Sequence, residues 1–256
     1  MGRVITLKSF SDNFTYLYQY DQSNVFAVDP CDSSIVLKAL ARNGLGLGKI
    51  FVTHHHWDHV GGVAELKASS NCEVIGGDEE RIGGIDRVVK DGEMICAGDL
   101  QIEVIATPGH TRTSVCYYLG RSKSNEQGIV WTGDTLFVAG CGRIFECTAG
   151  TMMKSLSKLA SLPDETLVYC GHDYTVEDLE FALSIEPNNK LVQERLKQVK
   201  ESVREGKQTV PSTILQERQT NPFLRAETKE IKCALNMPEC DTVEVFAELR
   251  RRKDIF

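Results

Sequence analysis

The chain lacks a long hydrophobic run. None of its apolar stretches approaches the roughly 18 residues that a membrane-spanning helix requires, so we expect no association with a membrane. The first residues, MGRVITLKSFSDNF, also lack the continuous apolar stretch of a secretory signal peptide. We therefore expect a cytoplasmic protein.

The cysteines lack the arrangement of a disulfide framework. Their number, nine, is odd, and no two of them form a C-x-x-C pair. This spacing favours reduced thiols in a reducing compartment, which agrees with the cytoplasmic expectation.

An excess of positive charge is also missing. The formal net charge is −7, which argues against a general role in binding nucleic acid. We expect a monomer that acts on a small molecule. The one dense basic cluster, residues 250–253 with the sequence RRRK, lies near the C-terminus. A solvated helix end explains such a run without any ligand, because cations are favourable there.

Two kinds of pattern divide the chain. Up to about residue 172, short apolar runs such as VFAVDP, KIFVTHHH and TLVYCGH alternate with polar turns and helical patterns, which is typical of a layered α/β domain. After residue 173, segments such as NKLVQERLKQVKESVREGK have the period and composition of helices. We expect an α/β domain over residues 1–173 and a small all-helical domain over residues 174–256, without further strands.

Histidine is scarce, but it is concentrated in one place. Four of the six histidines lie within FVTHHHWDHVGG, residues 51–62. If the backbone stays extended after the strand IFVT, alternation places His54, His56 and Asp58 on one side and His55 on the other. His59 then lies at the turn into the next helix. The two glycines that follow are expected to relieve crowding against a bound group.

Further candidate ligands follow other strand ends. His110 comes after IEVIATPG, Asp134 after GIVWTG and His172 after LVYCG, and side chains at strand ends gather at one rim of an α/β sheet. Taken alone, His110 or His172 would be explained equally well as a core or capping residue. The complete set has seven members: His54, His56, Asp58, His59, His110, Asp134 and His172.

Seven ligands exceed what one metal ion needs. A catalytic zinc usually takes three protein ligands and a water, so the set favours two ions that share a carboxylate. Nitrogen and carboxylate donors suit zinc, and they also suit iron or manganese.

These motifs resemble a known family. THHHWDH has the form T-H-x-H-x-D-H and, with the later TPGHT, TGD and CGH segments, resembles the metallo-β-lactamase superfamily. GDTLFVAGCGRIFE at 133–146, GHDYT at 171–175 and PSTILQERQTNPFLR at 211–225 resemble glyoxalase II, the hydroxyacylglutathione hydrolases. The resemblance implies an αββα sandwich followed by a helical glutathione-binding domain. It also implies a thioester hydrolase that converts S-(2-hydroxyacyl)glutathione, typically S-D-lactoylglutathione, to glutathione and D-lactate, the second step of methylglyoxal detoxification.

The resemblance also implies roles for individual residues. It implies two divalent metal ions per chain. Zinc is the expected metal, and iron or manganese are the alternatives. One ion would be held by His54, His56, His110 and Asp134, and the other by Asp58, His59, His172 and the same Asp134. A hydroxide between the ions would be the nucleophile, Asp58 and Asp134 would be the catalytic carboxylates, and Asp29 would support the ligands from a buried position.

Glutathione contacts follow from the same resemblance. They would come from Arg143, Ile144, Phe145, His172, Tyr174, Arg250 and Lys253. The family often has lysine at position 143, where the positive charge is retained. It often has tyrosine at position 145, so Phe145 lacks a hydroxyl that would bond the peptide.

Two other functions remain open from the sequence. A glutathione-persulfide dioxygenase of the same superfamily uses one iron, but it lacks the long helical domain that carries PSTILQERQTNPFLR and RRRK. A metal-binding or glutathione-sensing module without enzymatic activity would also retain these motifs. The C-terminal third and the intact ligand set favour the hydrolase.

Asp134→Ala is expected to abolish the two-ion site, because it removes the ligand that both ions would share. Metal analysis of the purified variant should then find fewer than two ions per chain. A variant that still holds two ions per chain would contradict the shared role of Asp134.

Overall fold

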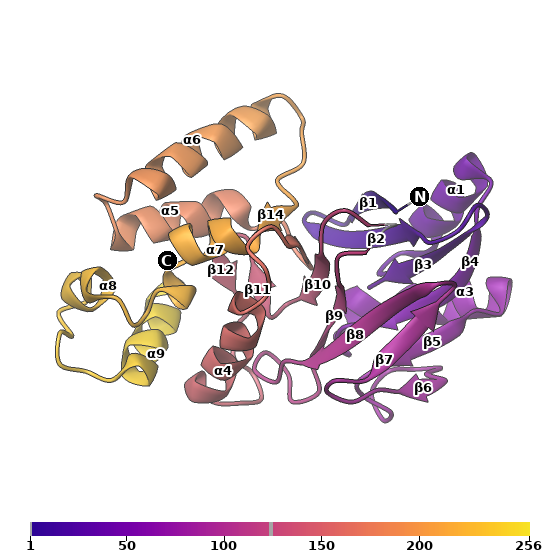
Figure 1. Cartoon of the computed structure of the whole chain (residues 1–256), viewed down its shortest axis with the longest axis horizontal. Helices are drawn as coiled ribbons and strands as arrows, with labels where there is room; N and C mark the ends of the chain where they lie inside the picture. Colours follow the sequence, from indigo (N-terminus) through magenta and orange to yellow (C-terminus); the bar gives the residue numbers. More distant parts are fainter. Residues whose placement is uncertain (1, 123–124) are drawn as a thin grey trace. The chain divides into compact units, whose positions relative to one another are not determined.

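The computed structural model describes residues 2–122 and 125–256 (Figure 1). The chain divides into two compact units. Unit 1 comprises Met1–Ala106 and Thr113–Gly133, and unit 2 comprises Thr107–Arg112 and Asp134–Phe256. No helix of the described residues is long and apolar enough to cross a membrane.

The first sheet of unit 1 carries the loop with the clustered histidines. Its strands lie in the order β1 (Arg3–Ser9), β2 (Asn13–Gln19), β3 (Asn24–Val28), β4 (Gly46–Val52), β5 (Glu73–Gly76) and β6 (Arg87–Val88). The first three are antiparallel neighbours, and β3 to β6 are parallel. The parallel part is connected by α1 (Ser33–Asn43), α2 (Trp57–Val60) and α3 (Val63–Ser70).

Alternation along the central strands gives this sheet two apolar faces. On β4, Ile50 and Val52 belong to the core cluster that includes Val36 of α1 and Leu66 of α3, whereas Phe51 stacks on Tyr117 at a centroid distance of 4.8 Å. A strand that is buried on both faces has consecutive apolar residues. This explains why IFV contains no polar residue.

A second sheet completes unit 1. The strands of this sheet that belong to unit 1 are β7 (Met94–Ala97), β8 (Leu100–Ala106), β9 (Val115–Leu119) and β10 (Ile129–Gly133), each antiparallel to the next. An aromatic layer joins it to the first sheet: Trp131 of β10 meets Phe26 of β3 edge to face at 5.2 Å. Tyr117 of β9 donates a hydrogen bond to the Val52 carbonyl at 2.8 Å. The layered α/β architecture predicted from the sequence is confirmed.

Unit 2 is mainly helical. Its strands are short: β11 (Leu136–Phe137) pairs with β12 (Gly140–Cys141), and β13 (Leu167–Cys170) pairs with β14 (Ser212–Thr213). Its helices are α4 (Ala149–Ala160), α5 (Thr175–Ile185), α6 (Lys190–Arg204), α7 (Ile214–Thr220), the 3₁₀ helix η1 (Pro222–Leu224), α8 (Lys229–Ala234) and α9 (Thr242–Lys253).

The helical C-terminal segment is confirmed, with one correction. The sequence predicts no strand after residue 173, but β14 pairs with β13 through Val168 and Ser212. Two residues are too few to leave a period in the sequence. The domain boundary predicted at residue 173 lies between β13 and α5 and remains a prediction.

Capping residues define where several helices begin. Asp32 caps α1 by accepting from the Ser34 N–H, and the helix ends before Gly44, which lies in the left-handed region with φ 65°. Thr213 and Asp241 form capping boxes at α7 and α9.

Candidate metal centre

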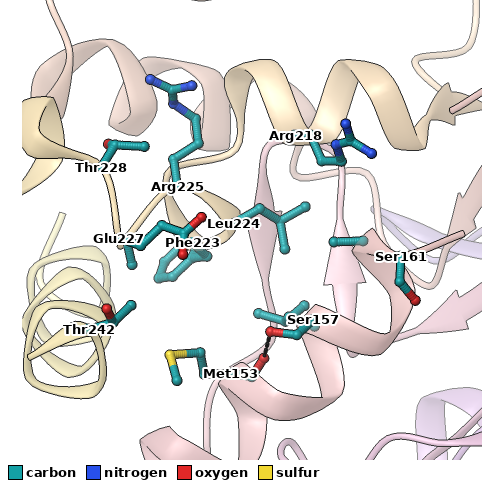
Figure 2. Close-up of a pocket in the computed structure, with 13 residues that line it drawn as sticks. Met153, Ser157, Ser161, Arg218, Phe223, Leu224, Arg225, Glu227, Thr228 and Thr242 are labelled. Carbon is teal, nitrogen blue, oxygen red and sulfur yellow. Dashed lines mark hydrogen bonds between the residues drawn. The ribbon is translucent and has the colours of Figure 1, made fainter.

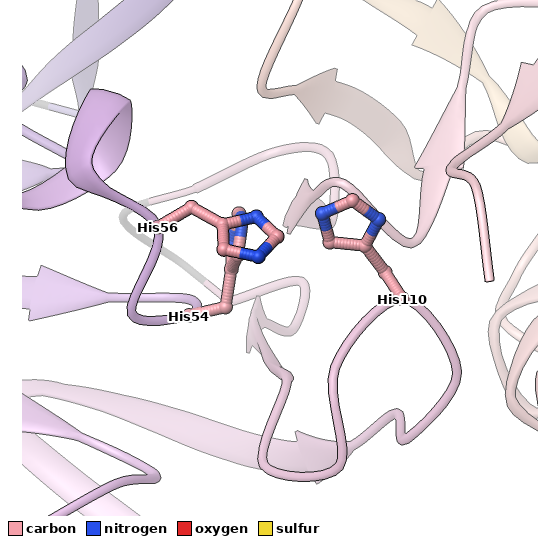
Figure 3. Close-up of side chains that lie close together, drawn as sticks. All are labelled: His54, His56 and His110. Carbon is pink, nitrogen blue, oxygen red and sulfur yellow. The ribbon is translucent and has the colours of Figure 1, made fainter. Parts of the chain in front are cut away.

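Four candidate ligands follow the end of β4 in unit 1. Figure 3 shows His54 and His56 on the loop after this strand, and the third ring drawn there, His110, belongs to unit 2. His54 Nε2 and His56 Nδ1 lie 3.1 Å apart, so one nitrogen of each ring faces the same point. His59 Nε2 lies 3.6 Å from Asp58 Oδ2 on α2. Imidazole and carboxylate donors therefore converge at this loop.

His55 points elsewhere. Its Nε2 lies 3.2 Å from Nη1 of Arg81, and Arg81 also pairs with the Asp78 carboxylate at 2.6 Å. A cation beside the ring is a poor environment for a metal ligand.

Asp29, at the end of β3, fixes this loop. It is 3% exposed, and its Oδ1 accepts from the Thr53 N–H at 2.8 Å. Its Oδ2 accepts from the Thr53 hydroxyl at 2.6 Å and lies 3.0 Å from His59 Nδ1. A carboxylate at Nδ1 holds the proton on that nitrogen and leaves Nε2 as the donor for a metal.

Asp29 could itself be considered a ligand. One ligand atom each from Asp29, His54 and His59 lies within 4.8 Å of the others. Both carboxylate oxygens of Asp29 already accept hydrogen bonds, and we therefore assign it to the support of the loop.

The two glycines after the histidine loop, Gly61 and Gly62, pack closely against the segment that follows β3. A Cβ on Gly61 would lie 2.6 Å from the Cys31 carbonyl oxygen, and a Cβ on Gly62 would lie 2.6 Å from that of Pro30. The Gly62 N–H donates to the same Pro30 oxygen at 2.8 Å. The glycines therefore allow close approach of two backbone segments, and relief of crowding against a bound group remains a prediction.

Asn13 also belongs to this site, although no pattern in the sequence points to it. Asn13, which is 5% exposed, donates from Nδ2 to the Asp58 carbonyl at 3.1 Å and to Asp58 Oδ2 at 3.0 Å. In the sequence, Asn13 belongs to SFSDNF, which carries no signal beyond that of an ordinary turn.

Unit 2 contributes a second group of candidate ligands. Asp134 follows β10, and its Oδ2 lies 3.5 Å from His110 Nε2 and 3.4 Å from His172 Nε2. All three residues are buried. His110 Nδ1 lies 2.8 Å from the Arg143 carbonyl oxygen, so this nitrogen carries the proton and Nε2 faces the carboxylate. Asp134 thus lies between two imidazoles, as a shared ligand would.

The candidate glutathione contacts in unit 2 differ in exposure. The side chain of Arg143 is 64% exposed and lies 3.7 Å from Asp254. Phe145 is 60% exposed, and its ring lies 5.2 Å from that of His110. Tyr174 stacks on His172 at 4.9 Å. Ile144, which lies between Arg143 and Phe145 in the sequence, is partly buried.

Two of the predicted basic contacts are turned inward. Arg250 donates from Nη1 to the Cys141 carbonyl at 2.7 Å. Lys253 forms ion pairs with Glu177 and, at 3.2 Å, with Asp178. Burial raises the pKa of Asp178 to about 7, against the opposing effect of the Lys253 ammonium. Neither cation is an exposed charge.

A separate cavity of about 550 Å³ opens in unit 2 (Figure 2). Its walls include Met153 of α4 and Phe223 of η1. Two arginines also line it, but Arg218 pairs with Asp164 and Arg225 pairs with Glu186. None of the seven candidate ligands is among its lining residues, all of which lie in the described part of the chain.

Two family models together match most of the chain. The model of the metallo-beta-lactamase superfamily matches residues 15–172, and that of the hydroxyacylglutathione hydrolase C-terminus matches residues 173–256. A relative from Methylococcus capsulatus named hydroxyacylglutathione hydrolase is 44% identical over 100% of this chain and 99% of its own length. The chain belongs to the hydroxyacylglutathione hydrolase family.

Further similarities support this family and its fold. A second relative of the same name, from Brucella anthropi, is 45% identical over 96% of this chain and 94% of its own length. Among solved structures, ETHE1 from Myxococcus xanthus superposes with a TM-score of 0.67 at 26% identity and covers 99% of both chains. The predicted family and fold class are confirmed. Membership of the metallo-beta-lactamase superfamily, together with the His/Asp cluster, implies divalent metal ions.

Asp29→Asn is expected to weaken binding of the metal ion that uses His59 by about 10- to 100-fold. An amide nitrogen cannot accept from Thr53 or from His59, so the ring would lose its fixed orientation. Competition with a chromophoric chelator measures this affinity. Asp78→Asn is the matched control, because Asp78 is a buried carboxylate of the same unit that bonds Arg81 and Thr113. Equal affinities in the two variants would contradict the role of Asp29.

Proposed function

We propose that this chain hydrolyses S-(2-hydroxyacyl)glutathione thioesters, S-D-lactoylglutathione among them, to glutathione and the free hydroxy acid. The observation that carries the proposal is the full-length match to relatives of that name, which includes the C-terminal segment specific to hydroxyacylglutathione hydrolases. The complete set of seven candidate ligands supports it.

We further propose two metal ions per chain, held as the resemblance implies. His54, His56 and His110 would bind one ion, Asp58, His59 and His172 the other, and Asp134 both. The position of Asp134 Oδ2 near two imidazole nitrogens supports the shared role. Zinc is the proposed metal, and iron or manganese would accept the same donors. When bound, such ions supply an activated water at neutral pH and polarise the thioester carbonyl.

The protein groups have distinct tasks in this reaction. Asp58 and Asp134 would be the catalytic carboxylates, and Asn13 holds Asp58 through its Oδ2. Asp58 would accept a proton during the reaction. The departing glutathione thiol has an ordinary pKa of about 8.5, so it can leave as a thiolate without a strong general acid.

We propose that residues 174–256, together with the segment at 143–145, bind the glutathione part. Arg143 is the exposed cation that would pair with a glutathione carboxylate. Arg250 and Lys253 are already paired inside unit 2, so replacing them would test stability as well as affinity. We also propose a cytoplasmic monomer without a nucleic acid or membrane partner. The net charge of −7 argues against nucleic acid binding, and the cysteine pattern supports a reducing compartment.

Protein reloaded with zinc is expected to hydrolyse S-D-lactoylglutathione, measured as loss of the thioester absorbance. A chelator should abolish the activity, and added zinc should restore it, because the activated water depends on the ions. A zinc-loaded or iron-loaded protein that leaves the thioester intact would contradict the proposal. Oxygen consumption with glutathione persulfide would then favour the dioxygenase.

Arg143→Ala is expected to raise KM for the thioester by about tenfold, the effect of losing one charge-assisted bond. The value of kcat should change by less than about twofold, because the proposed bond is to a glutathione carboxylate and not to the thioester carbonyl. Arg112→Ala is the matched control, since Arg112 is an exposed arginine of the same unit. An unchanged KM in Arg143→Ala would remove Arg143 from the binding site.

A further inference from the structure

The turn between β11 and β12 is held by three buried side chains from the C-terminal part of unit 2. They bond three consecutive residues of the backbone: the Ala139 N–H donates to Glu217 Oε2 at 2.7 Å, the Gly140 carbonyl accepts from Asn221 Nδ2 at 2.9 Å, and the Cys141 carbonyl accepts from Arg250 Nη1 at 2.7 Å. We call Glu217, Asn221 and Arg250 the turn clamp.

Glu217 is the rigid centre of the turn clamp. Its side chain is fully buried, and its two oxygens also accept from the Ser212 hydroxyl at 2.6 Å, from Arg195 at 2.7 Å and from Asn221 at 3.1 Å. A buried carboxylate is stable only when its lone pairs and its charge are satisfied in this way. The clamp therefore has one well-defined geometry.

The turn does not hold its conformation through its own sequence. Ala139 has φ 60°, in the left-handed region that disfavours residues with a Cβ. Gly140 is pressed against α5, since a Cβ there would lie 2.2 Å from Asp178 Oδ2. The bonds to the turn clamp hold the turn in this conformation, although Ala139 by itself would favour a negative φ.

The two residues that follow the turn lie against candidate ligands of unit 2. A Cβ on Gly142 would lie 2.0 Å from the Asp134 carbonyl oxygen and 3.0 Å from His110 Nδ1. The next residue, Arg143, presents the carbonyl that binds His110 Nδ1 at 2.8 Å. A shift of the turn would therefore displace both the backbone beside Asp134 and the partner of the His110 ring.

We propose that Glu217 and Asn221, together with Arg250, are positioning residues for the metal centre. They hold residues 139–141 so that the Arg143 carbonyl fixes His110 with Nε2 as the donor nitrogen. The inference rests on one part of the proposed function, the assignment of His110 and Asp134 as metal ligands. Glu217 and Asn221 are fully buried, so this part of PSTILQERQTNPFLR acts on the metal centre rather than on glutathione.

Asn221→Ala tests the proposal, with Thr228→Ala as its matched control. Asn221 also caps η1 by accepting from the Phe223 N–H at 3.0 Å, so its loss removes a cap as well as the hold on Gly140. Thr228 caps α8 in the same segment by accepting from the Ile231 N–H at 3.4 Å, and it is not part of the turn clamp. The control therefore loses a cap while the turn keeps its three bonds.

The readout is zinc affinity of the metal-free protein, measured by competition with a chromophoric chelator and without any thioester. Asn221→Ala is expected to bind at least one zinc ion about tenfold more weakly or worse, and Thr228→Ala is expected to bind zinc as the wild type does. Denaturant midpoints of both variants show how much of any loss of zinc affinity comes from a loss of overall stability. A protein that binds two zinc ions but hydrolyses no thioester would reject the proposed function and leave this inference standing.

Wild-type zinc affinity in Asn221→Ala, or an equal loss in both variants, would overturn the proposal. If Asn221→Ala does not fold, Asn221→Ser takes its place, because a serine hydroxyl can cap η1 and the variant lacks the amide that donates to Gly140. The same loss of zinc affinity is expected. Failure of both variants to fold would make Asn221 a purely structural residue and would also overturn the proposal.

Discussion

An imidazole ring offers two nitrogens, and it is a dependable metal ligand only when the protein holds one of them. In unit 1, His54 Nδ1 lies 3.0 Å from the Thr53 hydroxyl, and His59 Nδ1 lies 3.0 Å from Asp29. In unit 2, the Arg143 carbonyl holds His110 Nδ1. In each case Nε2 is left as the nitrogen that a metal could use. Under the proposed function, the positions of the ions, the water and the thioester would depend on these fixed rings.

The groups that hold the rings are themselves fixed by the fold. Asp29 directly follows β3, with φ 48°, and bonds Thr53, which directly follows the neighbouring strand β4. The parallel pair of strands therefore sets its position. The Arg143 carbonyl depends on the turn at 139–141. Since buried polar groups are costly unless they are bonded, Glu217 and its partners act together. The C-terminal segment thereby contributes to the candidate metal centre as well as to the proposed binding of glutathione.

Sequence reasoning was most effective where the pattern was local. Strand period and motif spacing pointed to the ligand set, and the layered fold and the family are confirmed. Contacts between distant residues left no such pattern: Glu217 bonds a residue 78 positions away, and Arg250 bonds one 109 positions away. The basic run at 250–253 shows why composition alone is insufficient. Helical periodicity turns Arg250 and Lys253 inward and leaves Arg251 62% exposed beside Glu248.

Anomalous diffraction at the zinc edge, from crystals of the zinc-loaded protein, tests the fixed-ring account most directly. The account predicts two peaks per chain. The first should lie at Nε2 of His54 and His110 and at Nδ1 of His56, the second at Nε2 of His59 and His172 with the Asp58 carboxylate, and Asp134 should touch both. A single peak, or a peak on the Nδ1 side of His59 or His110, would contradict it.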